Sequence, residues 1–119
     1  MNLTTERRGG YLAVHVQEPR IDAAIAIQFK DRMREIVADG PERIILDLSQ
    51  VGFLDSSGLG AVVAVRKALG AERRLELAGL TPSVAKVFRL TRMDSVFTLH
   101  PALPDHEEAG QAGALRDAG

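Results

Sequence analysis

The chain has 119 residues, a hydrophobic content of 45% and a formal net charge of −1, which suit one folded domain with its own core. It holds no cysteine, which excludes a disulfide scaffold and a thiolate zinc site and predicts a reducing compartment, the cytoplasm. The balanced charge and the lack of tryptophan argue against nucleic-acid binding, and no apolar run reaches the roughly 18 residues of a membrane helix.

The N-terminal segment predicts a β-hairpin. Leu3 to Arg7 has the composition of an edge strand, Gly9-Gly10 suits a hairpin turn, and a second strand follows over residues 11–16. In that second strand, Leu12, Val14 and Val16 share one face and His15 points to the other. We interpret His15 as a polar surface residue rather than a metal ligand or a catalytic base, because no partner stands at a recognisable spacing.

A loop from Glu18 to Asp22 leads into the first helix, with Asp22 as its predicted N-cap. The buried face of this helix is predicted from apolar residues at helical spacing, namely Ile25, Phe29, Met33, Ile36 and Val37. Asp39-Gly40-Pro41 ends the helix, because proline cannot continue it. Arg20 is interpreted as a solvated loop arginine, with a position near Ser56 as the alternative.

The most informative stretch joins a buried strand to a helix. An apolar run predicts an inner strand over residues 43–47, and the residues after position 58 return to helical spacing. Asp55-Ser56-Ser57-Gly58 lies at the junction, where either serine could be a simple helix cap. A phosphate on Ser56 would instead lie in the positive field of the helix N-terminus, which favours an anion by about 0.3–2 kcal/mol. Gly58 and Gly60 remove side chains from the first turn, so that another group can approach the backbone.

The helix after the junction carries no charged residue from Ser56 to Val65, and Gly70 ends it. A helix on one face of a sheet ordinarily has a polar outer side. This helix is therefore either deeply buried or presents an apolar patch to solvent.

The remaining segments complete an α/β pattern. We predict a strand over Leu75–Ala78, a helix that begins at Thr81-Pro82-Ser83, and a short final strand over 96–99. The alternation of strands and helices predicts a mixed β-sheet of four to five strands, with three or more helices that cover mainly one face. Because the composition changes from Pro101 onward, we expect a folded domain over residues 1–103 and a mobile acidic tail, rich in Ala and Gly, over 104–119, with a short, loosely docked helix as the alternative.

The sequence offers no recognisable catalytic site. Gly58-Leu59-Gly60 lacks the third glycine of a dinucleotide fingerprint and the lysine of a P-loop. A serine nucleophile needs a histidine base and an orienting acid, and no histidine can be placed beside Ser56 from the sequence. We interpret the aspartates near the junction as capping and loop-organising groups rather than metal ligands; they are Asp22, Asp47 and Asp55. We therefore predict a protein that is not an enzyme and holds no cofactor or metal.

The junction also resembles a known family. The sequence Asp55-Ser56-Ser57-Gly58-Leu59-Gly60, after an apolar strand that ends at Asp47, resembles the STAS domain of anti-anti-sigma factors, the anti-sigma factor antagonists. Weaker markers fall in the same order at Ile21-Asp22-Ala23 and over 77–84, so that the resemblance covers about residues 3–100. The sequence departs from the family at Pro19, where glycine is usual, and at Met93-Asp94, where glycine and an apolar residue are common.

The resemblance implies a binding module controlled by phosphorylation. The unphosphorylated chain would bind an anti-sigma factor that is also a serine kinase, and so release the sigma factor. Phosphorylation on Ser56 would switch this binding off, and a phosphoserine phosphatase would restore it. ATP and Mg²⁺ would belong to the kinase. The resemblance implies a partner-binding surface made of Asp22, Asp55, Ser56, Ser57, Gly58, Leu59, Gly60 and Val63.

Two alternatives stay open at this stage. One is a non-phosphorylated STAS scaffold within a larger signalling assembly, in which Ser56 is only a cap. The other is a sensor that binds a small molecule, a nucleotide or a lipid, at the glycine turn.

Overall fold

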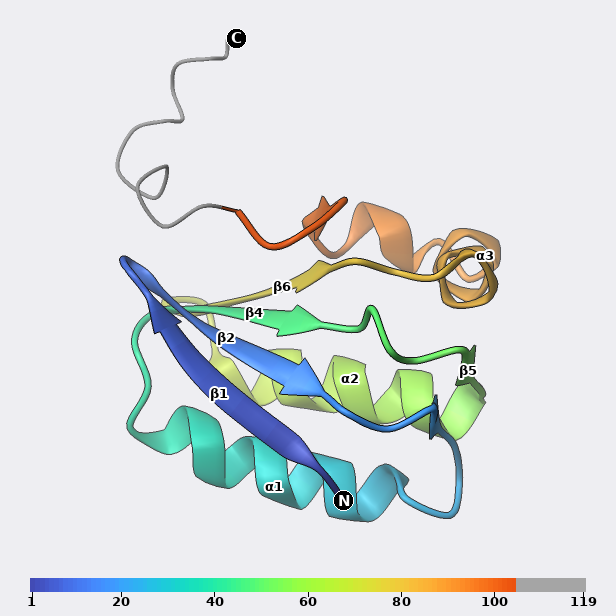
Figure 1. The fold of residues 1–119 in the computed structure, drawn as a ribbon, viewed down its shortest axis with the longest axis horizontal. Coiled ribbons are helices and arrows are strands. Elements are labelled where there is room, and N and C mark those ends of the chain that lie inside the picture. Colours follow the sequence, from blue (N-terminus) through green and yellow to red (C-terminus); the bar gives the residue numbers. More distant parts are fainter. Residues whose placement is uncertain (105–119) are drawn as a thin grey trace, which may run out of the picture.

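A computed structural model describes residues 1–104 of the chain. Its main sheet has five strands in the order β1-β2-β4-β6-β7 (Figure 1). These strands are β1 (Leu3–Arg8), β2 (Tyr11–Val16), β4 (Arg43–Asp47), β6 (Arg74–Ala78) and β7 (Leu99–His100). The β1–β2 pair is antiparallel and the other pairs are parallel, which confirms the predicted mixed sheet.

The helices lie mainly on one side of this sheet, as predicted. Helices α1 (Ala26–Ala38) and α2 (Ser56–Leu69) pack against each other below it, and α3 (Pro82–Leu90) lies at its end (Figure 1). A 3₁₀ helix, η1 (Met93–Ser95), follows α3. A second, two-stranded parallel sheet joins β3 (Arg20–Ile21) to β5 (Phe53–Leu54), and so ties the loop before α1 to the loop before α2.

The main core fills the space between the sheet and the helices. Its fully buried residues come from strands and helices alike, and include Val14, Ile44, Leu46, Leu77, Phe29, Met33, Val62 and Phe88. The rings of Phe88 and Phe97 pack edge to face, with centroids 5.8 Å apart. Among residues 1–104, the opposite face of the sheet carries a smaller apolar cluster, made of Tyr11, Ala13, Ile45 and Ala78 with Leu103 against them.

The structure corrects the predicted start of the first helix. Asp22 is not its N-cap, because a turn over residues 23–25 comes first and Ile25 takes the cap position. Asp22 caps this turn instead: its Oδ1 accepts a hydrogen bond from the Ala24 amide at 3.1 Å, and its carbonyl accepts one from Ala26 at 2.9 Å.

The predicted final strand is also misplaced. Residues 96–98 are not a strand, and β7 occupies only Leu99–His100. The reason is η1, whose Met93 carbonyl accepts hydrogen bonds from the amides of Val96 and Phe97 and so holds them away from the sheet. The chain first pairs with β6 at Thr98, whose carbonyl accepts from Leu77.

The end of the described chain lies against the sheet. The Tyr11 hydroxyl donates a hydrogen bond of 2.6 Å to the carbonyl of Pro104, the first residue of the predicted tail. The rest of that tail, residues 105–119, falls outside the described residues, so the division at residue 103 stays a prediction. Within residues 1–104, no helix has the length and apolar character needed to cross a membrane.

Candidate functional site

The junction between β5 and α2 is held by one carboxylate. Asp55 is the N-cap of α2, and its Oδ1 accepts a hydrogen bond of 2.9 Å from the Gly58 amide. Its Oδ2 accepts a second hydrogen bond, of 3.1 Å, from the Ala23 amide in the loop before α1. The cap is therefore the aspartate and neither serine, and the same side chain fixes the two loops to each other.

Ser56 and Ser57 are the first two residues of α2, and both are exposed. Within residues 1–104, neither serine side chain takes part in a hydrogen bond, because Asp55 already satisfies the amide that a capping serine would bind. The first turn of α2 contains no acidic residue. Both hydroxyls thus stand free at the positive end of a helix, where an added anion is favoured.

The two glycines of this turn have opposite surroundings. Gly58 is buried, and a Cβ there would collide with the carbonyl oxygen of Ile21 and lie 2.9 Å from its carbonyl carbon. A Cβ on Gly60 would meet nothing within 4 Å. Gly58 therefore admits strand β3 of the chain itself, whereas Gly60 leaves the surface open to another molecule.

A shallow apolar groove of about 310 Å³ begins at this turn and runs between α1 and α2. It is lined by Ala23, Ala26, Ile27, Lys30, Ser57, Gly60 and Ala61. Ile27 is 69% exposed, so its apolar side chain stands on the wall of the groove without cover from the core. Ile27 was not predicted as a site residue, although an isoleucine outside the buried face of an amphipathic helix is a signal from which it could be found.

The structure gathers most of the predicted partner-binding residues at this place. Asp22, Asp55 and Ser56 belong to the joined loops and the start of α2, and Ser57 and Gly60 line the groove. Leu59 and Val63 are only partly exposed and pack against the main core. Gly58 is buried, so it shapes the surface from below. Helix α2 thus shows both outcomes expected of an uncharged helix: one side is buried in the core, and the start of the helix lines an apolar groove.

Arg20 lies in the loop before α1, beside these residues, and its side chain has defined partners. Its Nε donates to Asp22 Oδ2 at 2.9 Å, and its guanidinium stacks over the Phe53 ring at 4.8 Å from the centroid. The interpretation of Arg20 as a merely solvated loop residue is therefore incomplete, since its contacts brace the loop before α1.

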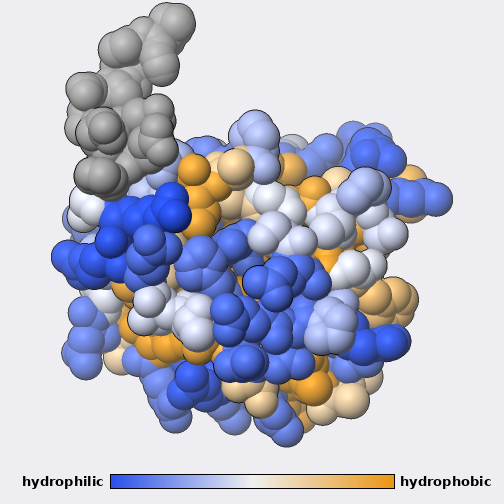
Figure 2. Space-filling model, in the orientation of Figure 1, coloured by the Kyte–Doolittle hydropathy of each residue, from blue (hydrophilic) through white to orange (hydrophobic). Residues whose placement is uncertain are grey.

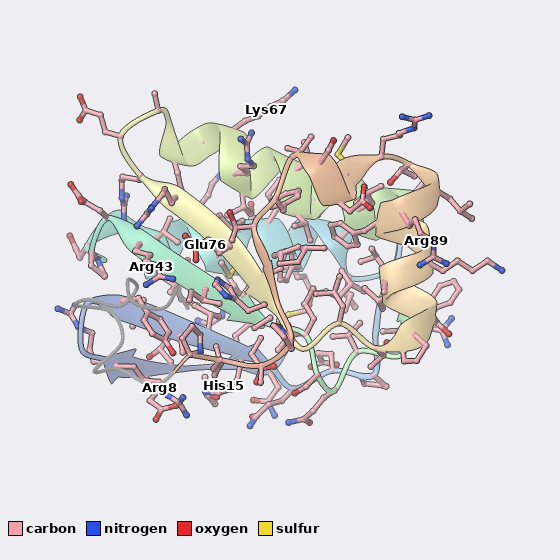
Figure 3. The ribbon with its side chains drawn as sticks, turned by 90° about the horizontal axis from the view of Figure 1, so that it is seen from above. Arg8, His15, Arg43, Lys67, Glu76 and Arg89 are labelled. Atoms are coloured by element: carbon pink, nitrogen blue, oxygen red, sulfur yellow. The ribbon has the colours of Figure 1, made fainter. Side chains whose placement is uncertain are left out.

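A separate polar cluster occupies the face of the sheet that is not covered by any helix of the described residues 1–104 (Figure 3). His15 Nδ1 lies 2.7 Å from Asp47 Oδ2, and His15 Nε2 lies 3.0 Å from Glu6 Oε1. Partial burial lowers the pKa of His15, but the hydrogen bonds to Glu6 and Asp47 outweigh it, and the net shift is upward. His15 is a partly exposed polar residue, as interpreted from the sequence, but it has two partners that spacing along the chain could not reveal, because they lie on other strands.

Glu76 anchors a second group on this face. It is 5% exposed, and its carboxylate accepts from Arg43 Nη2 at 2.9 Å and bonds to His100 Nε2 at 2.8 Å. Burial by itself raises the pKa of Glu76, but His100 and Arg43 together lower it to about 2. Neither group resembles a metal site: within residues 1–104, no cluster of three or more His, Cys, Asp or Glu side chains is arranged to hold a metal ion.

Comparison with known proteins agrees with this architecture. The sequence pattern of the STAS domain matches residues 2–106. The putative anti-sigma factor antagonist BtrV of Bordetella bronchiseptica is 31% identical over 94% of this chain and 94% of its own. The anti-sigma-F factor antagonist RsfB of Mycobacterium tuberculosis is 29% identical over 71% of this chain and 70% of its own.

The solved structures agree as well. The crystal structure of an anti-sigma factor antagonist from Mycobacterium paratuberculosis matches with a TM-score of 0.79 and 31% identity. That match covers 91% of this chain and 92% of the other.

Proposed function

The chain belongs to the STAS domain family, and from this premise we propose that it is an anti-sigma factor antagonist switched by phosphorylation on Ser56. In this proposal, the unphosphorylated form binds an anti-sigma factor that is a serine kinase, and so releases the sigma factor. The observation that carries it is the exposed Ser56 hydroxyl at the start of α2, beside a cap supplied by Asp55.

The geometry lets Ser56 accept a phosphate without loss of the fold. Its side chain is exposed and is not the helix cap, so a modification leaves the Asp55–Gly58 bond in place. The helix N-terminus favours the added anion by about 0.3–2 kcal/mol. Phosphorylation should therefore act on binding rather than on folding.

The same position lets a phosphate oppose a partner. The groove beside Ser56 is largely apolar, with Ile27 on its wall and Gly60 open to solvent, which suits an apolar side chain of the partner. Phosphorylation adds about −1.5 to −2 charges at the edge of the groove. Docking of the partner would then have to desolvate the phosphate or overcome its repulsion of acidic groups. A loss of about 4 kcal/mol would weaken the binding roughly a thousandfold.

The other components of the switch lie outside this chain. In the proposal, ATP and Mg²⁺ are bound by the kinase, and a separate phosphoserine phosphatase restores the hydroxyl. The chain contributes a surface and an acceptor hydroxyl, performs no catalysis, and acts in the cytoplasm.

The test is phosphate mapping with three variants and the kinase partner. Ser56→Ala should lose phosphate incorporation but still bind, and its stability should stay within about 0.5 kcal/mol because Asp55 keeps the cap. Ser56→Asp should fold and bind weakly. Ser57→Ala is the matched control and should be phosphorylated normally. Phosphate on Ser57, or on neither serine, in peptide mass mapping would show that the proposed switch is wrong.

A further inference from the structure

A second cleft lies at the other end of α2. It holds about 390 Å³ and is formed where the last turns of α2 face strand β6. Since α2 has 14 residues, the cleft is roughly 20 Å along the helix from Ser56. The lining residues are Arg66, Lys67, Gly70, Ala71, Arg73, Arg74, Leu75, Glu76, Val96 and Thr98.

The lining of this cleft is strongly cationic. Four of its residues carry positive charge, and Glu76 is the one acid among the lining residues. The Glu76 carboxylate forms an ion pair with Arg74 of the cleft, with Oε2 3.7 Å from Arg74 Nε, and is also bonded to Arg43 and His100, so its charge is shared with groups outside the cleft. Within residues 1–104, neither Arg66 nor Lys67 forms an ion pair.

Two of the cations are held in place by neutral groups. The guanidinium of Arg66 stacks over the Phe97 ring, 5.7 Å from its centroid. The Nη2 of Arg73 donates to the carbonyls of Val37, Gly40 and Pro41, at 2.6 to 3.2 Å. These contacts fix the positive groups beside the cleft without supplying a negative charge.

The floor of the cleft includes a stretch of the β6 edge that does not pair with β7. On the β7 side of β6, the backbone amides of Leu77 and Gly79 donate to the carbonyls of Thr98 and His100. On the opposite side, the backbone amide of Arg74 donates to the carbonyl of Glu42. By this alternation the Leu75 N–H points to the β7 side, where pairing with β7 begins only at Leu77. Leu75 is only 4% exposed and lines the cleft, so its amide is a donor directed into a cationic hollow.

Opposing charges reduce the field but do not cancel it. The C-terminal ends of α1 and α2 each contribute about half a negative charge, and Glu76 contributes one. Against four cations, roughly two positive charges remain. A monoanion would leave this field partly unbalanced, whereas a phosphate group at neutral pH carries about −1.5 to −2 charges.

We propose that this cleft is a binding site for a phosphate-type anion that carries two or more negative charges. The site is independent of the proposed switch, since it uses the cationic last turn of α2 and the open edge of β6. The anion can come from a free phosphorylated solute or from the headgroup of an anionic lipid, because both present the same oxygens.

The test titrates the full chain with sodium pyrophosphate at low salt and follows backbone amides by NMR. Saturable shifts at millimolar concentration or below are expected at Gly70, Ala71 and Leu75. Vesicles of phosphatidylcholine with and without phosphatidic acid form the second arm and identify a lipid source. Saturable binding in either arm supports the site only if it is weakened by the double substitution Arg66→Gln with Lys67→Gln. Absence of binding in both arms overturns the proposal.

A matched pair of variants separates the cleft from general attraction to a cation. Arg66→Gln with Lys67→Gln should weaken binding at least about tenfold. Lys86→Gln with Arg89→Gln removes the same two residue types from exposed positions on α3 and should change it less than about twofold. Equal losses in the two pairs would mean that the anion is held only by non-specific charge, and the proposal would be wrong.

Discussion

The two faces of the five-stranded sheet are stabilised by different interactions. On the face covered by α1 and α2, the strands present side chains such as Val14, Leu46 and Leu77, all fully buried. On the other face, the same strands present polar residues: His15 bonds to Asp47, and Glu76 pairs separately with Arg43 and His100. In the orientation of Figure 1, the surface shows hydrophobic residues in several separate places among hydrophilic ones (Figure 2).

Because the two faces differ in this way, they should respond to different changes in sequence and solvent. Apolar burial depends little on pH or salt, so the covered face should fail mainly when its packing is changed. Ion pairs depend on protonation and are screened by salt, so the uncovered face should respond to the solvent.

The largest effect is expected from a charge on the covered side. Val62 is fully buried, so Val62→Glu should cost about 4 kcal/mol or more, because its carboxylate would have no partner. Glutamate at Ala61 or Val65, which are also buried, should unfold the domain similarly. The partly exposed Val63 and Ala64 should tolerate glutamate, and at least one of these two variants should lose partner binding.

Thermal melting and partner capture, measured on all five variants, decide this prediction. If every variant that loses binding also loses stability, the outer side of α2 belongs to the core and is not a docking surface.

The next largest effect is expected at Gly58. Gly58→Ala places a methyl group against the backbone of Ile21, which cannot move as a side chain can, so we expect a loss of about 3 kcal/mol. Gly60→Ala is the matched control in the same turn, where the added methyl meets nothing. It should raise stability by about 0.5–1 kcal/mol. Similar melting temperatures for the two variants would contradict the packing argument.

Acid should act through the uncovered face. The pKa of Glu76 falls from 4.5 to about 2 in the folded chain, so its contribution is complete above pH 4.5 and is lost as the pH falls toward 2. The contribution is about 3 kcal/mol as an upper bound. Glu76→Gln should therefore be less stable at neutral pH and should show a flatter loss of stability in this acid window.

Urea unfolding between pH 7 and pH 2.5 measures that effect. Gly58→Ala serves as the control, because it lowers stability without removing a titrating group and should keep the slope of the unaltered chain. An unchanged slope in Glu76→Gln would show that other carboxylates dominate the acid response.

The smallest effect is expected where the chain leaves the sheet. Removal of residues 104–119 deletes the hydrogen bond from Tyr11 to Pro104 and should cost at most about 1 kcal/mol, with partner affinity unchanged. A chain that ends at Pro104 keeps this bond and should melt with the full-length protein. A fall of more than several degrees in the second case would mean that residues 105–119 stabilise the domain.

Local patterns in the sequence were enough to predict most of the fold. The alternation in residues 11–16 and the apolar run before Asp47 predicted β2 and β4, and helical spacing predicted the buried face of α1, where Phe29, Met33 and Val37 are buried. These signals succeed because one face of each element is buried by apolar area, which leaves a regular trace in the sequence.

What could not be predicted depends on contacts between distant residues. The partners of His15 follow from the register of three strands, and the delayed start of β7 follows from hydrogen bonds within η1. The sequence predicted Asp55 as a capping and loop-organising group, which the structure confirms, but it left either serine open as the helix cap. Only the structure shows that neither serine is the cap, and that Ile27 from another helix completes the groove.

The two hydrogen bonds that the Asp55 carboxylate accepts have a consequence for the motions of the site. One carboxylate holds the amide of Ala23 and the amide of Gly58, in segments more than thirty residues apart. For either amide to exchange with deuterium, its hydrogen bond to Asp55 must break. Such a break loosens the side chain that also protects the other amide. The two amides should therefore show correlated protection from hydrogen exchange, and the loops before α1 and α2 should open as one cooperative unit.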